Sequence, residues 1–389
     1  MRPAERVEAG LRNEKLMHRP STKIDGAHAL IGRSGRTARG AGPLRTWTVA
    51  TTMALLAVLA SFSDGASLQG QAPLPARLDS YITQHVRLTP AQRKELLAGH
   101  PVTRLLDADP AREVSVFGAV WVNAPISRYV AAVKNIEEFE KGGSFLITKK
   151  ISVPPRLEDF APLRMPPDDV KDLKSCKVGA CELKLSEATL ARVREEIDWS
   201  KPTATADVEQ LTRRLLLDYV NGYREGGNAR LAVYRDSSRP TFVGQEFASM
   251  VERMPSLTEY LPSLKRYLLD FPKASLPNSE HFFYWQEAKF GLKPTIRVNH
   301  VTITEDPTHA TVTSKMLYAT HYFWTALELR VLVPDPSRGQ GFWFANVNRS
   351  RSDGLTGFTG SVIGGKVRRE AENGMEAALK ITKSRMEKP

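Results

Sequence analysis

From about residue 281 onward, apolar and polar side chains alternate with a period of two. Four segments share this pattern: HFFYWQEAKF, TIRVNHVTITED, ATVTSKMLYATHYFWTALELRVLV and GFWFANVNRSRSD. Such alternation predicts strands, and the turn-forming stretches EDPTHA and PDPSRGQG between them predict an antiparallel meander. Within residues 315–333 the bulky apolar residues move from even to odd positions, so we expect a bulge or turn near 320–325. That shift decides which way His321 points.

The segments on either side of the middle of the chain have equally clear periods. EVSVFGAVWVNAP (113–125) is apolar at odd and even positions, which predicts a strand covered on both faces. It leads into a helix with apolar residues on one side, APISRYVAAVKNIEEFEKG, and then into a strand, SFLITKKISV. At the other end, residues 357–387 carry apolar side chains on one face of a long closing helix.

The middle of the chain is mainly helical in pattern. Residues 185–199, 205–227 and 243–271 have helical periods, with Pro262 interrupting the third, and residues 229–236 form a short predicted strand. Residues 67–111 are predicted to be a helical preface in which Thr89 caps a helix that ends at Gly99.

This order of elements predicts an α+β fold: a curved antiparallel sheet packed around a long C-terminal helix, with a helical insertion at about 175–275. The order resembles the START-like or helix-grip superfamily over residues 113–150 and 281–387. The resemblance implies one domain at 112–389, an apolar cavity between the sheet and the closing helix, and a lipid, sterol or polyketide as ligand. The family has no common catalytic set, so the resemblance assigns no catalytic residue.

Aromatic side chains crowd into the predicted sheet. Core packing explains many of them, but Tyr and Trp also suit the wall of a cavity that holds an amphiphilic ligand. The predicted ligand-pocket residues are Trp121, Tyr284, Trp285, Tyr318, Tyr322, Trp324, Trp343, Val367 and Met375.

His300 and His321 are the weak candidates for catalysis, as a general base or a metal ligand. No third ligand stands at a defined spacing, so we expect no metal site, and a single histidine on a strand is usually structural. GSVIGGKV (360–367) has Val367 where a phosphate-binding loop needs Ser or Thr, and no G-x-S-x-G motif is present. We therefore assign no catalytic residue and expect no cofactor.

The N-terminal residues predict export. Arg45, the uncharged run Thr46–Ser63 and the small residues after it form a signal peptide at 45–66, which predicts a periplasmic or secreted protein. An uncleaved N-terminal membrane anchor is the alternative. Residues 1–44 are expected to be a disordered leader or to precede the true start codon.

Cys176 and Cys181 are the two cysteines, and in an oxidising compartment they predict a disulfide that closes a small loop. A metal half-site is the alternative, but no second Cys or His pair matches it.

The net charge of +12 favours acidic surfaces, such as those of phospholipids, and allows peripheral membrane contact. No basic cluster is interleaved with aromatics as in nucleic-acid-binding modules, so we expect no nucleic-acid partner. The sequence thus predicts an exported protein that binds a hydrophobic small molecule, with a lipid as the expected class. Two alternatives remain: a cyclase-like or hydrolase-like enzyme with a histidine base, and an envelope structural or interaction protein.

Overall fold

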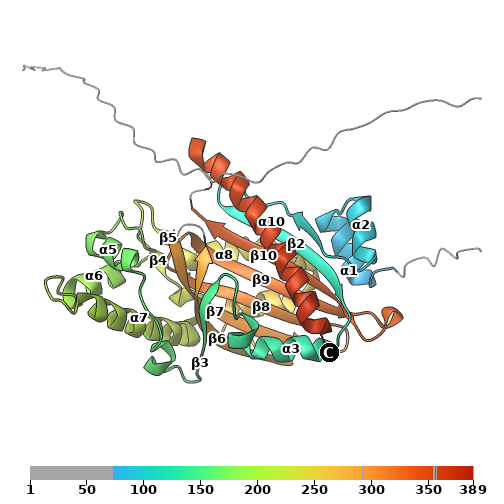
Figure 1. Ribbon diagram of the computed structural model, residues 1–389, viewed down its shortest axis with the longest axis horizontal. Helices are drawn as coiled ribbons and strands as arrows, with labels where there is room; N and C mark the ends of the chain where they lie inside the picture. The colour runs from blue at the N-terminus through green and yellow to red at the C-terminus, as the bar shows by residue number, and fades with distance from the viewer. Residues whose placement is uncertain (1–72, 291–292, 354, 356, 389) are drawn as a thin grey trace, which may run out of the picture. The chain divides into compact units, whose positions relative to one another are not determined.

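The computed structural model describes residues 73–290, 293–353, 355 and 357–388, without the side chains of residues 290 and 357–363. Its centre is an antiparallel sheet of eight strands in the order β1-β2-β10-β9-β8-β7-β6-β3 (Figure 1). The strands are β1 (Val102–Leu105), β2 (Glu113–Val122), β3 (Phe145–Ile151), β6 (Ser279–Phe290), β7 (Lys293–Glu305), β8 (Ala310–Ala319), β9 (Phe323–Pro334) and β10 (Phe342–Ser352). The predicted meander is confirmed, since β6 to β10 pair in succession.

Helices lie before, within and after the strands. They are α1 (Ala76–Tyr81), α2 (Pro90–Leu97), α3 (Ile126–Lys134), α4 (Ile136–Phe139), α5 (Pro167–Ser175), α6 (Glu187–Glu196), α7 (Ala204–Gly226), α8 (Val243–Glu252), α9 (Pro262–Asp270) and α10 (Gly357–Glu387). The predicted start of α2 is confirmed, because the Thr89 hydroxyl accepts a hydrogen bond from Gln92 N and Pro90 occupies the first helical position. The described residues belong to one compact unit.

Both faces of the sheet are covered. In β2, Val120 and Val122 pack with α3 and α10, whereas the alternating residues Phe117 and Ala119 pack with α8 and the N-terminal helices. Because neighbouring side chains of a strand point to opposite faces, these are two separate apolar layers. In Figure 1, α10 and α3 lie in front of the sheet and α8 lies behind it.

The closing helix lies directly against β2. A Cβ atom placed on Gly118 would lie 2.6 Å from Cγ of Met375 and 2.9 Å from a methyl group of Leu379. Glycine at this position therefore allows α10 to approach the middle of the strand.

The predicted shift of register within 315–333 is a turn. β8 ends at Ala319, β9 begins at Phe323, and Tyr322 between them has a φ of 61°. The alternation restarts after this turn, which explains why the apolar residues change from even to odd positions.

Two predictions about secondary structure were incomplete. The segment predicted as a helical preface also contains β1, a four-residue strand that pairs with β2 at the edge of the sheet. The strand predicted over 229–236 reduces to Val233–Tyr234 (β4), which pairs with Thr241–Phe242 (β5) in a separate two-stranded sheet. A segment this short depends on its pairing partner more than on its own pattern.

The residues for which we predict a leader and a signal peptide, or alternatively a membrane anchor, lie outside the described residues. Among the helices that the structure describes, none combines the length and apolarity needed to span a bilayer. The disulfide between Cys176 and Cys181 is confirmed.

Candidate functional site

The structure does not bring the predicted pocket residues together. Tyr284 and Met375 lie on the face of the sheet that carries α10. Trp121 and Trp343 lie on the opposite face, with ring centroids 5.2 Å apart. The Arg338 guanidinium lies over both indoles, so this pair is part of a packed layer.

The other five predicted pocket residues lie elsewhere. Trp285 belongs to the core shared with α5, α6 and α7, and Tyr318 packs against that core. Tyr322 lies in the turn before β9 and Trp324 at the start of that strand, and both are partly buried. Val367 of α10 is 37% exposed.

A group of polar residues lies on the α10 face of the sheet, where the sequence predicted an apolar wall. This polar stripe crosses β10, β9, β7 and β6 and consists of Asn346, Glu328, Arg330, Arg297, Asn299, Gln286 and Tyr284, joined by Glu140 after α4. Asn346 pairs in register with Arg330, and Asn299 with Tyr284. The stripe therefore follows the register of the sheet across its middle.

Glu328 and Arg330 of the polar stripe form an ion pair, and Glu140 has neutral partners. The Glu328 carboxylate accepts hydrogen bonds from Arg330 and, at 2.7 Å, from Asn346. Burial raises the pKa of Glu328, but the adjacent Arg330 charge and these hydrogen bonds outweigh it, so its pKa lies below the usual value. Glu140 accepts hydrogen bonds from Tyr284 and Gln286, and burial raises the pKa of its carboxyl group.

Three buried polar atoms of this region have no hydrogen-bond partner among the described residues. They are the hydroxyl of Tyr129 on α3, which lies near the Arg330 guanidinium without forming a hydrogen bond of ordinary geometry, the amide nitrogen of Asn299 and the amide oxygen of Asn346. Each of the three residues is at most 3% exposed. Buried polar atoms without partners are rare and usually indicate a bound molecule, water or a strained site.

Two adjoining hollows lie in the helical insertion, each with a volume of about 430 Å³. Lys174 and Trp199 line both hollows. The ionisable residues that line them are all basic: Lys171, Lys174, Lys177 and Arg194. No ion pair joins any of these four to another described residue. Apolar side chains such as Leu173, Val193 and Val170 form the floor of these basic hollows.

His321 is buried and contacts both α5 and the loop that follows the disulfide. Its Nε2 lies 3.0 Å from both carboxylate oxygens of Asp169 in α5, and its Nδ1 lies 3.2 Å from the carbonyl oxygen of Glu182. Asp169 lies in the first turn of α5 and is buried. The contact ties the β8–β9 turn to the disulfide-containing loop, and His321 lines neither hollow.

His300 lies on the face away from α10. It stacks on Phe283, with ring centroids 4.5 Å apart, and hydrogen-bonds to Tyr223 and His281. It pairs in register with Lys315, whose side chain is completely buried. In the described part of the chain, no group of three or more His, Cys, Asp or Glu residues is placed to hold a metal ion.

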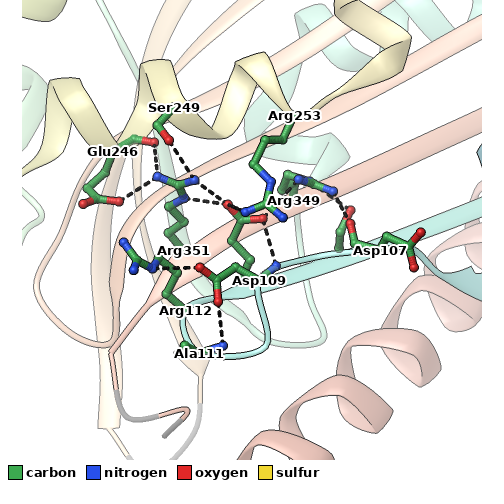
Figure 2. A network of polar contacts seen from close by, with 11 residues as sticks. Asp107, Asp109, Ala111, Arg112, Glu246, Ser249, Arg253, Arg349 and Arg351 are labelled. Atoms are coloured by element: carbon green, nitrogen blue, oxygen red, sulfur yellow. Dashed lines mark hydrogen bonds and ion pairs between the residues drawn. The ribbon is translucent and has the colours of Figure 1, made fainter.

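A fully paired charge cluster lies further along that same face, beneath α8. The buried Glu113 carboxylate accepts hydrogen bonds from Arg349 at 3.0 Å and from Arg351 at 2.7 Å. Figure 2 shows Arg351 reaching Glu246 and Ser249 of α8. We call Glu113, Arg349, Arg351 and Glu246 the glutamate–arginine cluster, and we assign it a structural role.

No protein-family model matches this chain, and no curated protein matches its sequence. The functional argument therefore rests on the residues of the chain itself.

Sequence reasoning missed the polar stripe, although one indication was present. Glu328 and Arg330 stand two residues apart on the same side of a strand in the middle of the meander, opposite Leu327 and Leu329. The predicted pocket residues did not include either of them. Because helices cover both faces, this side is an interior surface.

Proposed function

We propose that the protein binds a hydrophobic small molecule, of which a lipid is the expected class, between the sheet and α10. The single observation that carries this proposal is the set of three unpartnered polar atoms of Tyr129, Asn299 and Asn346 on that face. An unsatisfied buried polar atom costs about 1–3 kcal/mol, so a molecule that pairs with these atoms gains binding free energy from each.

The chemistry of this face limits the ligand. A hydroxyl group, an amide donor and an amide acceptor complement hydroxyl and carbonyl groups of a ligand. Around them lie apolar side chains of the same layer, including Phe342, Phe344 and Leu332. The proposed ligand is therefore a mainly apolar molecule with at least one hydroxyl or carbonyl group.

The order of elements supports the proposed helix-grip arrangement. Two short helices, α3 and α4, separate β2 from β3, a meander follows the insertion, and α10 packs across β2. In such an arrangement the ligand lies between sheet and closing helix, the face on which the polar stripe is found.

Native mass spectrometry of the protein purified from its own envelope tests the proposal. We expect a co-purifying mass that dissociates on collisional activation. Asn299→Leu and Asn346→Leu, which keep the side-chain size and remove the amide, are expected to lower the bound fraction. Thr325→Val is the matched control, because Thr325 also has a buried unpartnered oxygen and pairs in register with Arg351 on the opposite face. Absence of any bound mass, together with no thermal shift from a panel of lipids, would refute the proposal.

We also propose peripheral contact of the helical insertion with anionic membrane surfaces, because the basic hollows combine four unpaired cations with an apolar floor and Trp199. Each such cation near an anionic surface contributes about 1 kcal/mol, and Trp suits the interface.

Flotation with phosphatidylserine-containing and purely phosphatidylcholine vesicles tests this contact. Binding is expected only to the anionic vesicles and is expected to weaken as salt rises. The variant Lys174→Glu with Arg194→Glu should lose it. A variant with the same change in charge, Lys94→Glu with Lys366→Glu, lies away from the hollows and should keep it. Equal loss in both variants would show that only net charge matters.

A further inference from the structure

Four side chains form a continuous hydrogen-bonded row from the interior to the surface. Lys315 Nζ lies 3.0 Å from the Tyr223 hydroxyl, which lies 3.3 Å from Nδ1 of His300. Nε2 of His300 lies 3.1 Å from Nδ1 of His281. Lys315 has no exposed surface, whereas His281 is exposed. We call these four residues the histidine–lysine chain.

The Lys315 amine is surrounded by neutral groups. It also contacts the amide oxygen of Asn228 and, at 3.4 Å, the carbonyl oxygen of Leu268. The Asn228 amide nitrogen donates to the carbonyl oxygens of Leu268 and Leu269, which turns its oxygen toward the amine. The Phe247 ring centroid lies 4.1 Å from Nζ.

No carboxylate offsets a charge on this amine. Tyr223 from α7 faces the amine, His300 from β7 follows it, and Tyr267 from α9 and His281 from β6 contact His300, while α8 contributes the ring of Phe247. Arg224 of α7 acts on His281 and adds positive charge. Among the described residues, Lys315 has no ion pair. Burial accordingly lowers the pKa of Lys315 well below its usual value, and burial with the neighbouring His281 and Lys315 lowers that of His300.

We propose that Lys315 is an uncharged amine in the folded protein and that the histidine–lysine chain is a proton-binding site, loaded from solvent through His281. This goes beyond ligand binding on the other face of the sheet and does not depend on it.

The hydrogen bonds can be satisfied in two directions that differ by one proton. In the unloaded state, His281 Nδ1–H donates to His300 Nε2, His300 Nδ1–H donates to the Tyr223 oxygen, and the Tyr223 hydroxyl donates to the lone pair of Lys315. A proton that bonds to Nε2 of His281 displaces each of these hydrogens one step along the chain. The Tyr223 hydrogen then bonds to Lys315, which becomes an ammonium that donates to Asn228, Leu268 and Tyr223.

The ring tautomers of the two histidines test this assignment directly. In ¹⁵N-histidine spectra of the full chain near pH 8, both His281 and His300 are expected as Nδ1–H tautomers. The Nε2–H tautomer at His300, together with a charged Lys315 seen by ¹³Cε shift, would overturn the proposal. Lys315→Met is expected to change the His300 ring shifts because it removes the last acceptor.

The pH dependence of the free energy of unfolding is a second test, because a lysine that stays charged in the folded state would not contribute to it. Below the unfolded pKa of about 10.5, the unfolded state binds one more proton at Lys315 than the folded state, so the unfolding equilibrium constant should rise tenfold from this group for each pH unit lost, until the depressed folded pKa is reached. Lys315→Met should remove that slope. Lys184→Met is the matched control: Lys184 is nearly as buried but its Nζ lies 3.0 Å from the Asp236 carboxylate, and its loss should leave the Lys315 slope in place. Equal slopes in wild type and Lys315→Met would refute the proposal.

Discussion

Two polar clusters lie on the same face of the sheet, and both contact α8, but they hold buried charge in opposite ways. In the glutamate–arginine cluster, one carboxylate receives hydrogen bonds from two arginines, and Arg351 continues to Glu246 (Figure 2). In the histidine–lysine chain, the amine of Lys315 has only neutral partners. A buried ionisable group is tolerated when it forms an ion pair or when it is neutral. The glutamate–arginine cluster has ion pairs, and we propose a neutral amine for the histidine–lysine chain.

The register of the strands explains the difference. Arg351 pairs with Glu113 and Arg349 with Ser115, so β2 and β10 place opposite charges side by side. Lys315 instead pairs with His300 and Leu327 on its two neighbouring strands. No acidic side chain is in register there, so pairing across strands provides no counter-charge.

The largest expected effect comes from removing the central carboxylate. Glu113→Gln leaves the buried guanidinium groups of Arg349 and Arg351 without their shared anion, which should lower the free energy of unfolding by about 3–5 kcal/mol. Urea denaturation measures it. Glu376→Gln, in an exposed pair with Lys380 on α10, should cost at most about 0.5 kcal/mol. A loss under about 1 kcal/mol for Glu113→Gln would contradict the role assigned to the cluster.

A smaller loss of stability is expected when the positive charge of Arg351 is kept but the shape of its guanidinium group is changed. Arg351→Lys keeps the positive charge but cannot bind Glu113 and Glu246 at once, as the guanidinium does. We expect a loss of about 2–3 kcal/mol, measured in the same way. If Arg351→Lys matches the wild type, charge alone holds α8 to the sheet and the directed hydrogen bonds are dispensable.

The elements of both clusters could be predicted from the sequence, but their partners could not. Strands β6 to β10 and the long α10 follow from their periods of two and 3.6, because one apolar side of each element must be buried. β1 was missed since four residues carry too little pattern, and only pairing with β2 makes them a strand.

The candidate site was less predictable because alternation identifies the two sides of a strand without saying what covers each. We expected Trp121 and Trp343 to face a ligand, and the structure places them in the opposite layer. Conversely, Glu328 and Arg330 were not among the predicted pocket residues and lie beneath α3 and α4. Helices on both faces remove the contrast between buried and solvated sides on which such reasoning depends.

Removing the Lys315 amine should lower the free energy of unfolding less than removing the Glu113 carboxylate. Lys315→Met takes away no favourable ion pair but leaves the Asn228 oxygen and the Tyr223 hydroxyl short of a partner, so we expect a loss of about 1–2 kcal/mol at pH 9. The difference should shrink and then reverse sign as the pH falls, because the depressed pKa of Lys315 costs the wild type more stability with each step below the ordinary lysine value of 10.5. This cost becomes constant only below the folded pKa. Urea denaturation between pH 7 and 9 measures both. A loss that stays constant with pH would place a charged lysine in the folded state.

The smallest effect on stability is expected at the exposed end of the histidine–lysine chain. His281→Phe keeps a ring beside Phe271 and Phe283 and should change the free energy of unfolding by no more than about 0.5 kcal/mol at pH 8. It nevertheless removes the donor to His300 Nε2, so the His300 ring-nitrogen shifts should move toward a mixture of tautomers. His100→Phe, at an exposed histidine paired with Glu95, should leave those shifts unchanged. His281→Phe should therefore change the His300 tautomer while leaving the free energy of unfolding nearly unchanged, which ordinary packing would not do. Unchanged His300 shifts would show that His281 is not part of the hydrogen-bonded chain.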